Sequence, residues 1–127
     1  MIAVDTSALM AIALDEPTAD ACVEALEAAD EILASAGTLA EALIVAGPRS
    51  RIPEINNLIA RLPVTVVAIT EAMARNVGDA HARWGKGLHP AGLNFGDCFA
   101  YALAKERGCP LLYVGADFAR TDVIGAF

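Results

Sequence analysis

A brief apolar run, Ile2-Ala3-Val4, passes directly into the polar cluster Asp5-Thr6-Ser7. The run is rich in β-branched residues, which favours a strand, and Asp, Thr and Ser are residues that cap the start of a helix. We therefore predict a short buried strand that is followed at once by a helix over residues 8–14. This pattern leaves one acidic side chain, that of Asp5, at the carboxyl end of the strand.

Strand-like and helix-like segments alternate along the rest of the chain. Further strands are predicted over residues 32–34, 64–67, 111–114 and 123–124, and further helices over residues 17–29, 38–46, 53–62, 71–84 and 96–107. The predicted strands are too uniformly apolar to have one face in water, which indicates a parallel sheet covered by helices on both faces. We predict a single α/β domain over residues 1–127, with three α/β/α layers and a central, mostly parallel sheet.

The segment over residues 71–84 has the clearest helical pattern. Its apolar residues Met73, Val77, Ala80 and Trp84 recur at helical spacing and form one stripe. We predict that this stripe is buried, and that Trp84 and Tyr101 belong to the core rather than to a surface that stacks on bases. Residues 85–94 contain Gly, Lys, His and Pro and are predicted to form the longest irregular loop.

The composition of the 127 residues indicates a folded protein with few cationic side chains. Hydrophobic residues make up 56% and charged residues 20%, which excludes intrinsic disorder. The net charge of −7 argues against binding nucleic acid through a broad basic surface, but it permits an acidic site that reaches a phosphate through a metal ion. The three cysteines include no CxxC pair and no apolar stretch is long enough to cross a bilayer, so we expect a cytoplasmic protein with reduced thiols and no membrane partner.

Four acidic side chains fall where the carboxyl ends of the predicted strands meet, which is where open α/β sheets bind ligands. Asp5 and Asp117 follow predicted strands, Asp97 lies in the first turn of a helix, and Glu41 lies one turn inside another. Asp97 and Glu41 each have an ordinary explanation as well, as a helix cap and a solvated helix residue. Four like charges at one sheet edge would repel one another unless a cation joined them, and carboxylates are ligands that Mg²⁺ and Mn²⁺ prefer.

Four short segments form a recognisable pattern when they are taken together. They are Val4-Asp5-Thr6-Ser7-Ala8-Leu9, Thr38-Leu39-Ala40-Glu41-Ala42, Leu93-Asn94-Phe95-Gly96-Asp97-Cys98-Phe99-Ala100-Tyr101-Ala102 and Gly115-Ala116-Asp117-Phe118. In this order and at this spacing they resemble the VapC toxins, which are PIN-domain ribonucleases of bacterial type II toxin–antitoxin modules. The resemblance covers essentially the whole chain. Two positions depart from it, because Val114 and Leu88 stand where many relatives have basic residues.

The resemblance implies an endoribonuclease that depends on Mg²⁺ or Mn²⁺ and hydrolyses RNA with a metal-activated water. In that family four acidic positions form the metal site, so it implies a catalytic, metal-binding role for Asp5, Glu41, Asp97 and Asp117. We expect Asp5 and Asp97 to bind the principal ion, and Glu41 and Asp117 to bind a second ion or to orient the attacking water. In-line attack would leave a 5′-phosphate and a 3′-hydroxyl.

Three polar residues are candidates for holding the carboxylates through hydrogen bonds: Thr6, Ser7 and Asn94. Helix capping explains Thr6 and Ser7 about equally well, and a loop turn explains Asn94. The cations best suited to meet an RNA backbone are Arg83, Lys86, Lys105, Arg107 and Arg120.

The resemblance also implies macromolecular partners. A VapB-type antitoxin is expected to cover the acidic site with its C-terminal segment, docking as an amphipathic helix near Leu9, Ile12 and Leu14. Family members usually form homodimers, so a homodimer is expected here too. The sequence does not identify the RNA substrate.

Two other functions stay open at the level of sequence. A phosphatase of the haloacid dehalogenase type also begins with a strand and a DxT-like motif, but it requires a second Asp where this chain has Ser7. A catalytically silent PIN module that acts as a protein-binding partner is the other alternative. The four carboxylates argue against it, whereas Val114 and Leu88 are compatible with it.

Overall fold

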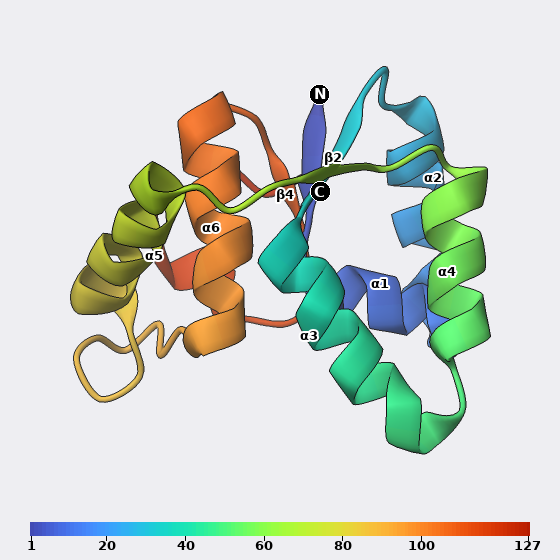
Figure 1. Cartoon of the computed structure of the whole chain (residues 1–127), viewed down its shortest axis with the longest axis horizontal. Helices are drawn as coiled ribbons and strands as arrows, with labels where there is room; N and C mark the ends of the chain where they lie inside the picture. The colour runs from blue at the N-terminus through green and yellow to red at the C-terminus, as the bar shows by residue number, and fades with distance from the viewer.

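The computed structural model describes all 127 residues and is built around a central parallel sheet (Figure 1). The strands are β1 (Ile2–Val4), β2 (Ile32–Ser35), β3 (Thr65–Val67) and β4 (Leu111–Leu112), in the order β3-β2-β1-β4. Each neighbouring pair is parallel. The chain adds strands to one side of β1 and then crosses to its other side for β4, so the carboxyl ends of β1 and β4 flank the point where ligands bind in such sheets.

Helices cover both faces of the sheet. They are α1 (Thr6–Ala13), α2 (Ala19–Ala28), α3 (Ala36–Ala46), α4 (Ile52–Arg61), α5 (Glu71–Trp84) and α6 (Phe95–Arg107), with single 3₁₀ turns η1 (Gly47–Arg49) and η2 (Phe118–Arg120). In Figure 1, α5 and α6 lie on one side of the sheet and α1, α2 and α4 on the other. This arrangement confirms the predicted α/β/α layers. No helix combines the length and the apolar composition that a membrane crossing requires.

The core is divided into two layers by the sheet. Ala3, Leu33 and Leu111 pack into a cluster with α5 and α6, whereas their neighbours Val4 and Leu112 pack into a cluster with α1, α2 and α4. Alternate residues of each strand therefore face opposite layers. Because both faces are buried, the strands carry no polar alternation, as their sequences indicated.

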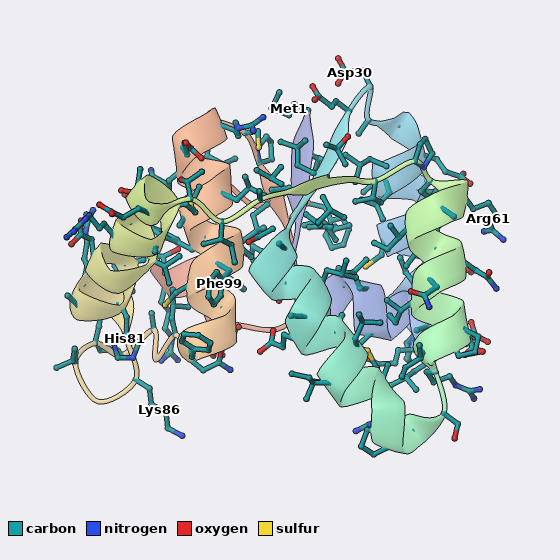
Figure 2. The ribbon with its side chains drawn as sticks, viewed as in Figure 1. Met1, Asp30, Arg61, His81, Lys86 and Phe99 are labelled. Atoms are coloured by element: carbon teal, nitrogen blue, oxygen red, sulfur yellow. The ribbon has the colours of Figure 1, made fainter.

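The predicted apolar stripe of α5 is confirmed, since Met73, Val77, Ala80 and Trp84 are all buried. Tyr101 is also buried, and its hydroxyl accepts a hydrogen bond of 2.9 Å from Trp84 Nε1. Both rings thus belong to the core. Helix α6 approaches α3 closely through Phe99, which Figure 2 shows on the α6 ribbon. Gly37 of α3 permits this approach, because a Cβ there would lie 2.5 Å from the Phe99 ring.

The ends of several elements differ from the predicted ends for local reasons. α1 and α3 begin at Thr6 and Ala36, earlier than predicted, because the side chains of Asp5 and Ser35 accept hydrogen bonds from the first turns and act as the caps. β4 ends at Leu112 rather than at residue 114. The predicted strand over residues 123–124 is wrong; these residues are in no strand, and the following residue, Gly125, forms an isolated bridge with Leu111.

Candidate metal centre

Asp5 is the most buried acidic residue of the site and lies at the junction of β1 and α1. It is 2% exposed. Its Oδ2 accepts hydrogen bonds from the backbone N–H of Ser7 at 3.0 Å and from Ser7 Oγ at 2.7 Å, whereas its Oδ1 is buried without a partner. Burial raises the pKa of Asp5 to about 7, with the charges of Asp97 and Glu41 adding to the rise and the Ser7 hydrogen bonds opposing it.

Ser7 connects Asp5 to the strand on its other side. The Ser7 hydroxyl donates to Asp5 and accepts a hydrogen bond of 3.0 Å from the backbone N–H of Val114, just beyond β4. The Thr6 hydroxyl has a different role, because it donates to the carbonyl oxygen of Thr38 at 3.3 Å and links α1 to α3. Of the two predicted hydroxyl contacts to the site, only that of Ser7 reaches a carboxylate.

Asp97 combines a helix cap with a place in the acidic cluster. Its Oδ2 accepts from the backbone N–H of Asn94 at 3.0 Å, and Asn94 Oδ1 accepts from the backbone N–H of Asp97 at 2.8 Å, which is a reciprocal capping box. Burial raises the pKa of Asp97, and the charges of Glu41 and Asp117 add to this rise, whereas the hydrogen bond from Asn94 lowers it. Asp97 is therefore a helix cap that also lies near the other carboxylates, and its role as a metal ligand stays a prediction.

Glu41 reaches the cluster from α3 across the first turn of α6. Its carboxylate lies so close to Gly96 that a Cβ at this position would overlap with it. Glycine is unfavourable inside a helix, so its presence directly before Asp97 is a signal that another group approaches the backbone there. The sequence interpretation missed this role of Gly96.

Asp117 lies at the residue before η2. It is exposed, and its charge acts on Asp97 rather than on Asp5. Asp5, Glu41 and Asp97 thus form a mutually repelling group, with Asp117 as a neighbour of Asp97. No three side chains of His, Cys, Asp or Glu are close enough, as they stand, to hold one metal ion together.

The donor atoms nevertheless fit a hard divalent cation. Such ions prefer carboxylate oxygens, and the unpartnered Oδ1 of buried Asp5 is an acceptor whose desolvation nothing in the chain offsets. A cation in this position would satisfy that oxygen and relieve the repulsion from Asp97 and Glu41.

The basic residues expected to meet RNA are mostly engaged elsewhere. Arg83 and Lys105 form ion pairs with Asp122 at 3.5 and 3.3 Å, and Arg120 donates to the carbonyl oxygen of Pro90 at 3.1 Å. Lys86 projects from the loop that follows α5 (Figure 2). The two residues that depart from the family pattern have different surroundings. Leu88 is exposed on that same loop, whereas Val114 is half-buried beside Ser7.

The expected antitoxin groove near the early helices requires a correction. Leu9 is fully buried in the core and cannot line a surface groove. Ile12 lines a cavity of about 230 Å³ between α1 and α4, together with Asn57, Leu58 and Arg61. The surface between α1 and α4 is therefore half polar, and Leu9 takes no part in it because its side chain packs in the core.

Comparisons with known proteins agree with the fold and with the order of the motifs. Residues 2–124 match the PIN domain family. The chain is 42% identical over 123 residues to ribonuclease VapC30 of Mycobacterium tuberculosis, covering 94% of each protein. It is 46% identical over 125 residues to ribonuclease VapC28 of the same species, covering 94% of this chain and 93% of that protein.

Solved structures of lower sequence identity share the fold. The crystal structure of VapC20 of Mycobacterium tuberculosis, described as a toxin that cleaves the sarcin-ricin loop, superposes with a TM-score of 0.80 at 15% identity and covers 98% of this chain and 97% of that one. A toxin–antitoxin complex from Klebsiella pneumoniae gives a TM-score of 0.73 at 18% identity, covering 100% and 98%. The chain therefore belongs to the PIN-domain family and, within that family, to the VapC ribonucleases.

Proposed function

We propose that this protein is a Mg²⁺- or Mn²⁺-dependent endoribonuclease that acts as the toxin of a VapBC-type toxin–antitoxin module. The observation that carries the proposal is the buried Asp5 carboxylate, with one unpartnered oxygen beside two other carboxylates, in a chain whose relatives are ribonucleases. Capping a helix does not require Asp5 to lie near Asp97 and Glu41, whose charges repel it.

Asp5 and Asp97 would hold the principal ion. Both are fixed before any ligand binds, Asp5 by Ser7 and Asp97 by its reciprocal hydrogen bonds with Asn94. A divalent ion supplies positive charge that attracts a phosphodiester and makes a nearby water more acidic. Glu41 and Asp117 would bind a second ion or accept hydrogen bonds from the attacking water, which sets its direction relative to the scissile bond.

RNA recognition would depend on shape and on unstacked bases rather than on bulk charge. With nine Lys and Arg residues and a net charge of −7, the chain lacks a wide cationic surface. The phosphate backbone would therefore be attracted mainly at the metal centre.

The decisive experiment compares Asp97→Asn with Glu106→Gln, an exposed acid on the same helix. The amide oxygen introduced by Asp97→Asn could still accept the hydrogen bond from the backbone N–H of Asn94, so the cap persists while the charge is lost. We expect RNA cleavage in Mn²⁺ to fall at least about 100-fold in Asp97→Asn and to stay at the wild-type rate in the control. Expression of the wild-type chain alone should arrest growth, and Asp97→Asn should relieve the arrest.

Wild-type cleavage by Asp97→Asn would contradict the proposal. A wild-type protein that neither binds Mn²⁺ nor cuts RNA would instead support the alternative of a silent PIN module that binds other proteins.

A VapB-type antitoxin and a second copy of the chain are the proposed protein partners. Ile44 and Phe95 are 74% and 75% exposed, and they line a cavity of about 520 Å³ together with Ile69, Glu41 and further apolar residues of α3 and α6. Exposed apolar patches of this kind mark protein interfaces, and a protruding side chain next to a cavity suits a two-fold contact. Sedimentation of the purified chain at micromolar concentration tests the homodimer, which a monomer at all concentrations would contradict.

A further inference from the structure

The carboxylate of Asp117 is not held in place by any direct contact of its own. Its carboxylate accepts no hydrogen bond within the chain, and it lies on an exposed turn between β4 and the single turn η2. On the N-terminal side of Asp117, the backbone N–H of Val114 donates a hydrogen bond to Ser7 Oγ. Downstream, Arg120 of η2 donates to the carbonyl oxygen of Pro90, and the segment that follows η2 adds a further anchor.

That segment is held by two internal hydrogen bonds and is joined to helix α6 through Asp122. Phe118, directly after Asp117, is buried, and its carbonyl oxygen accepts a hydrogen bond of 2.7 Å from Thr121 Oγ1. Thr121 Oγ1 in turn accepts from the backbone N–H of Val123 at 3.3 Å. Between these two residues, Asp122 Oδ1 accepts a hydrogen bond of 2.5 Å from the hydroxyl of Tyr101.

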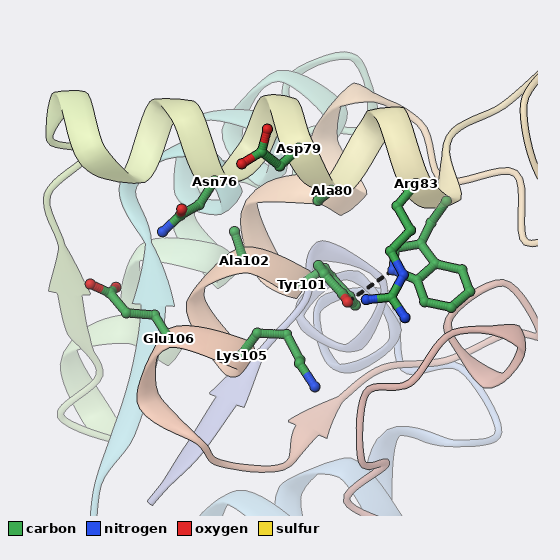
Figure 3. Close-up of a pocket in the computed structure, with 9 residues that line it drawn as sticks. Asn76, Asp79, Ala80, Arg83, Tyr101, Ala102, Lys105 and Glu106 are labelled. Atoms are coloured by element: carbon green, nitrogen blue, oxygen red, sulfur yellow. Dashed lines mark hydrogen bonds between the residues drawn. The ribbon is translucent and has the colours of Figure 1, made fainter.

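The Tyr101 hydroxyl has a fixed direction. It accepts from Trp84 Nε1 at 2.9 Å, so its own hydrogen points to Asp122. Figure 3 shows Tyr101 and Lys105 on α6 facing Arg83 on α5, with the Trp84 hydrogen bond drawn as a dashed line. The ion pairs of Asp122 with Arg83 and Lys105 are longer and involve exposed side chains, so the short bond from the buried tyrosine is the stronger tie.

Helix α6 therefore carries Asp97 and is hydrogen-bonded to the segment that follows Asp117. Asp97 and Tyr101 are four residues apart and lie on one face of the helix. Asp97 belongs to the acidic cluster itself, and Tyr101 fastens the segment that carries Asp117. We propose that Tyr101 and Asp122 are positioning residues that set the Asp117 carboxylate beside Asp97 for metal binding. This inference rests on the proposed metal-dependent function.

The test is a double-mutant cycle that measures Mn²⁺ affinity by calorimetry. Tyr101→Phe removes one hydroxyl and should weaken Mn²⁺ binding about tenfold, the size typical of residues that orient metal ligands. In an Asp117→Asn background the same substitution should have no further effect on Mn²⁺ affinity. Tyr113→Phe is the matched control, because its hydroxyl donates to no residue of the segment, and it should bind Mn²⁺ as the wild type does.

Thermal melting in EDTA distinguishes a positioning role of Tyr101 from a role in folding stability. Tyr101→Phe leaves Trp84 Nε1 without its acceptor, so a similar loss of stability is expected in the wild-type and Asp117→Asn backgrounds. The loss of Mn²⁺ affinity, by contrast, is expected only in the wild-type background. If Tyr101→Phe does not fold, Asp122→Ala, which removes the acceptor of the Tyr101 hydroxyl, replaces it in the same cycle.

Unchanged Mn²⁺ affinity in Tyr101→Phe, or an equal loss with and without the Asp117 carboxylate, would overturn the positioning role. Absence of Mn²⁺ binding by the wild type would overturn it together with the proposed metal centre. Mn²⁺ binding without RNA cleavage would contradict the proposed ribonuclease function alone, and the cycle would still decide the role of Tyr101.

Discussion

Asp5 and Asp117 follow neighbouring strands, β1 and β4, yet their surroundings are opposite. Asp5 is buried, receives two hydrogen bonds from Ser7 and has a pKa raised to about 7. Asp117 is exposed and receives no hydrogen bond. One carboxylate is therefore built into the core of the sheet edge, and the other is held only through the backbone on either side of it.

This difference shows two ways of supplying a metal ligand. A buried carboxylate is fixed before the ion arrives, but its desolvation and the repulsion from its neighbours destabilise the metal-free fold. An exposed carboxylate costs the fold little, but its position depends on tethers outside the site. Substitutions at Asp5, Gly96 and Asp117 test how far this contrast extends to stability, metal binding and catalysis.

The largest effect is expected from the titration of Asp5. Its folded-state pKa of about 7 lies above the ordinary value of 3.8, so between these values the folded protein keeps a proton that the unfolded chain releases. Stability in EDTA should therefore fall as the pH rises from about 4 to 7, by up to about 4 kcal/mol, and should then level off. Urea unfolding at pH 4 and pH 8 measures this difference.

Asp5→Asn supplies the comparison for that experiment. The variant has no proton to release at this position, so its stability should change much less between the two pH values, and at pH 8 it should exceed that of the wild type in EDTA. Equal pH dependence of stability in both proteins would show that Asp5 is not the titrating group. The charge of buried Asp5 would then not destabilise the metal-free fold, and in this respect Asp5 would not differ from Asp117.

A second prediction concerns the approach of Glu41 to α6. Gly96→Ala should displace the Glu41 carboxylate, since the added methyl group overlaps with it, and should weaken Mn²⁺ binding and RNA cleavage by roughly 10- to 100-fold. Gly78→Ala is the control, because a Cβ at this position of α5 meets nothing within 4 Å. The control should retain Mn²⁺ affinity and gain up to about 1 kcal/mol of stability from helix propensity. Normal Mn²⁺ affinity in Gly96→Ala would place Glu41 outside the metal centre.

Much of the fold was predictable because each element has a local cause. The apolar strands, the stripe from Met73 to Trp84 and the helix stop at Gly108, with its positive φ of 60°, all follow from residue type and spacing. The predicted starts of α1 and α3 were two residues too late, because Asp5 and Ser35 act as the caps. The short β4 was overextended, since its apolar sequence continues beyond the last paired residue.

The supporting contacts of the site were less predictable because they join residues far apart in sequence. Asp5, Asp97 and Glu41 fell together as expected from strand order, but the link from Ser7 to Val114 spans 107 positions. Likewise, no local pattern relates Tyr101 to Asp122. Such contacts depend on the packing of β4 and α6 against β1, which periodicity does not specify.

The smallest effect is expected from Asp117→Asn. Its side chain is exposed and accepts no hydrogen bond, so stability in EDTA should change by less than about 0.5 kcal/mol. Mn²⁺ affinity should fall about tenfold, which is less than the loss in Asp97→Asn, because a carboxylate in solvent restricts the ion less than one fixed by burial and by a cap. Calorimetry with Asp79→Asn, an exposed acid of α5, as the control would measure this difference. A loss as large as that of Asp97→Asn would mean that the tethered carboxylate binds the ion as firmly as the buried ones, and burial would then not be what distinguishes the ligands of this centre.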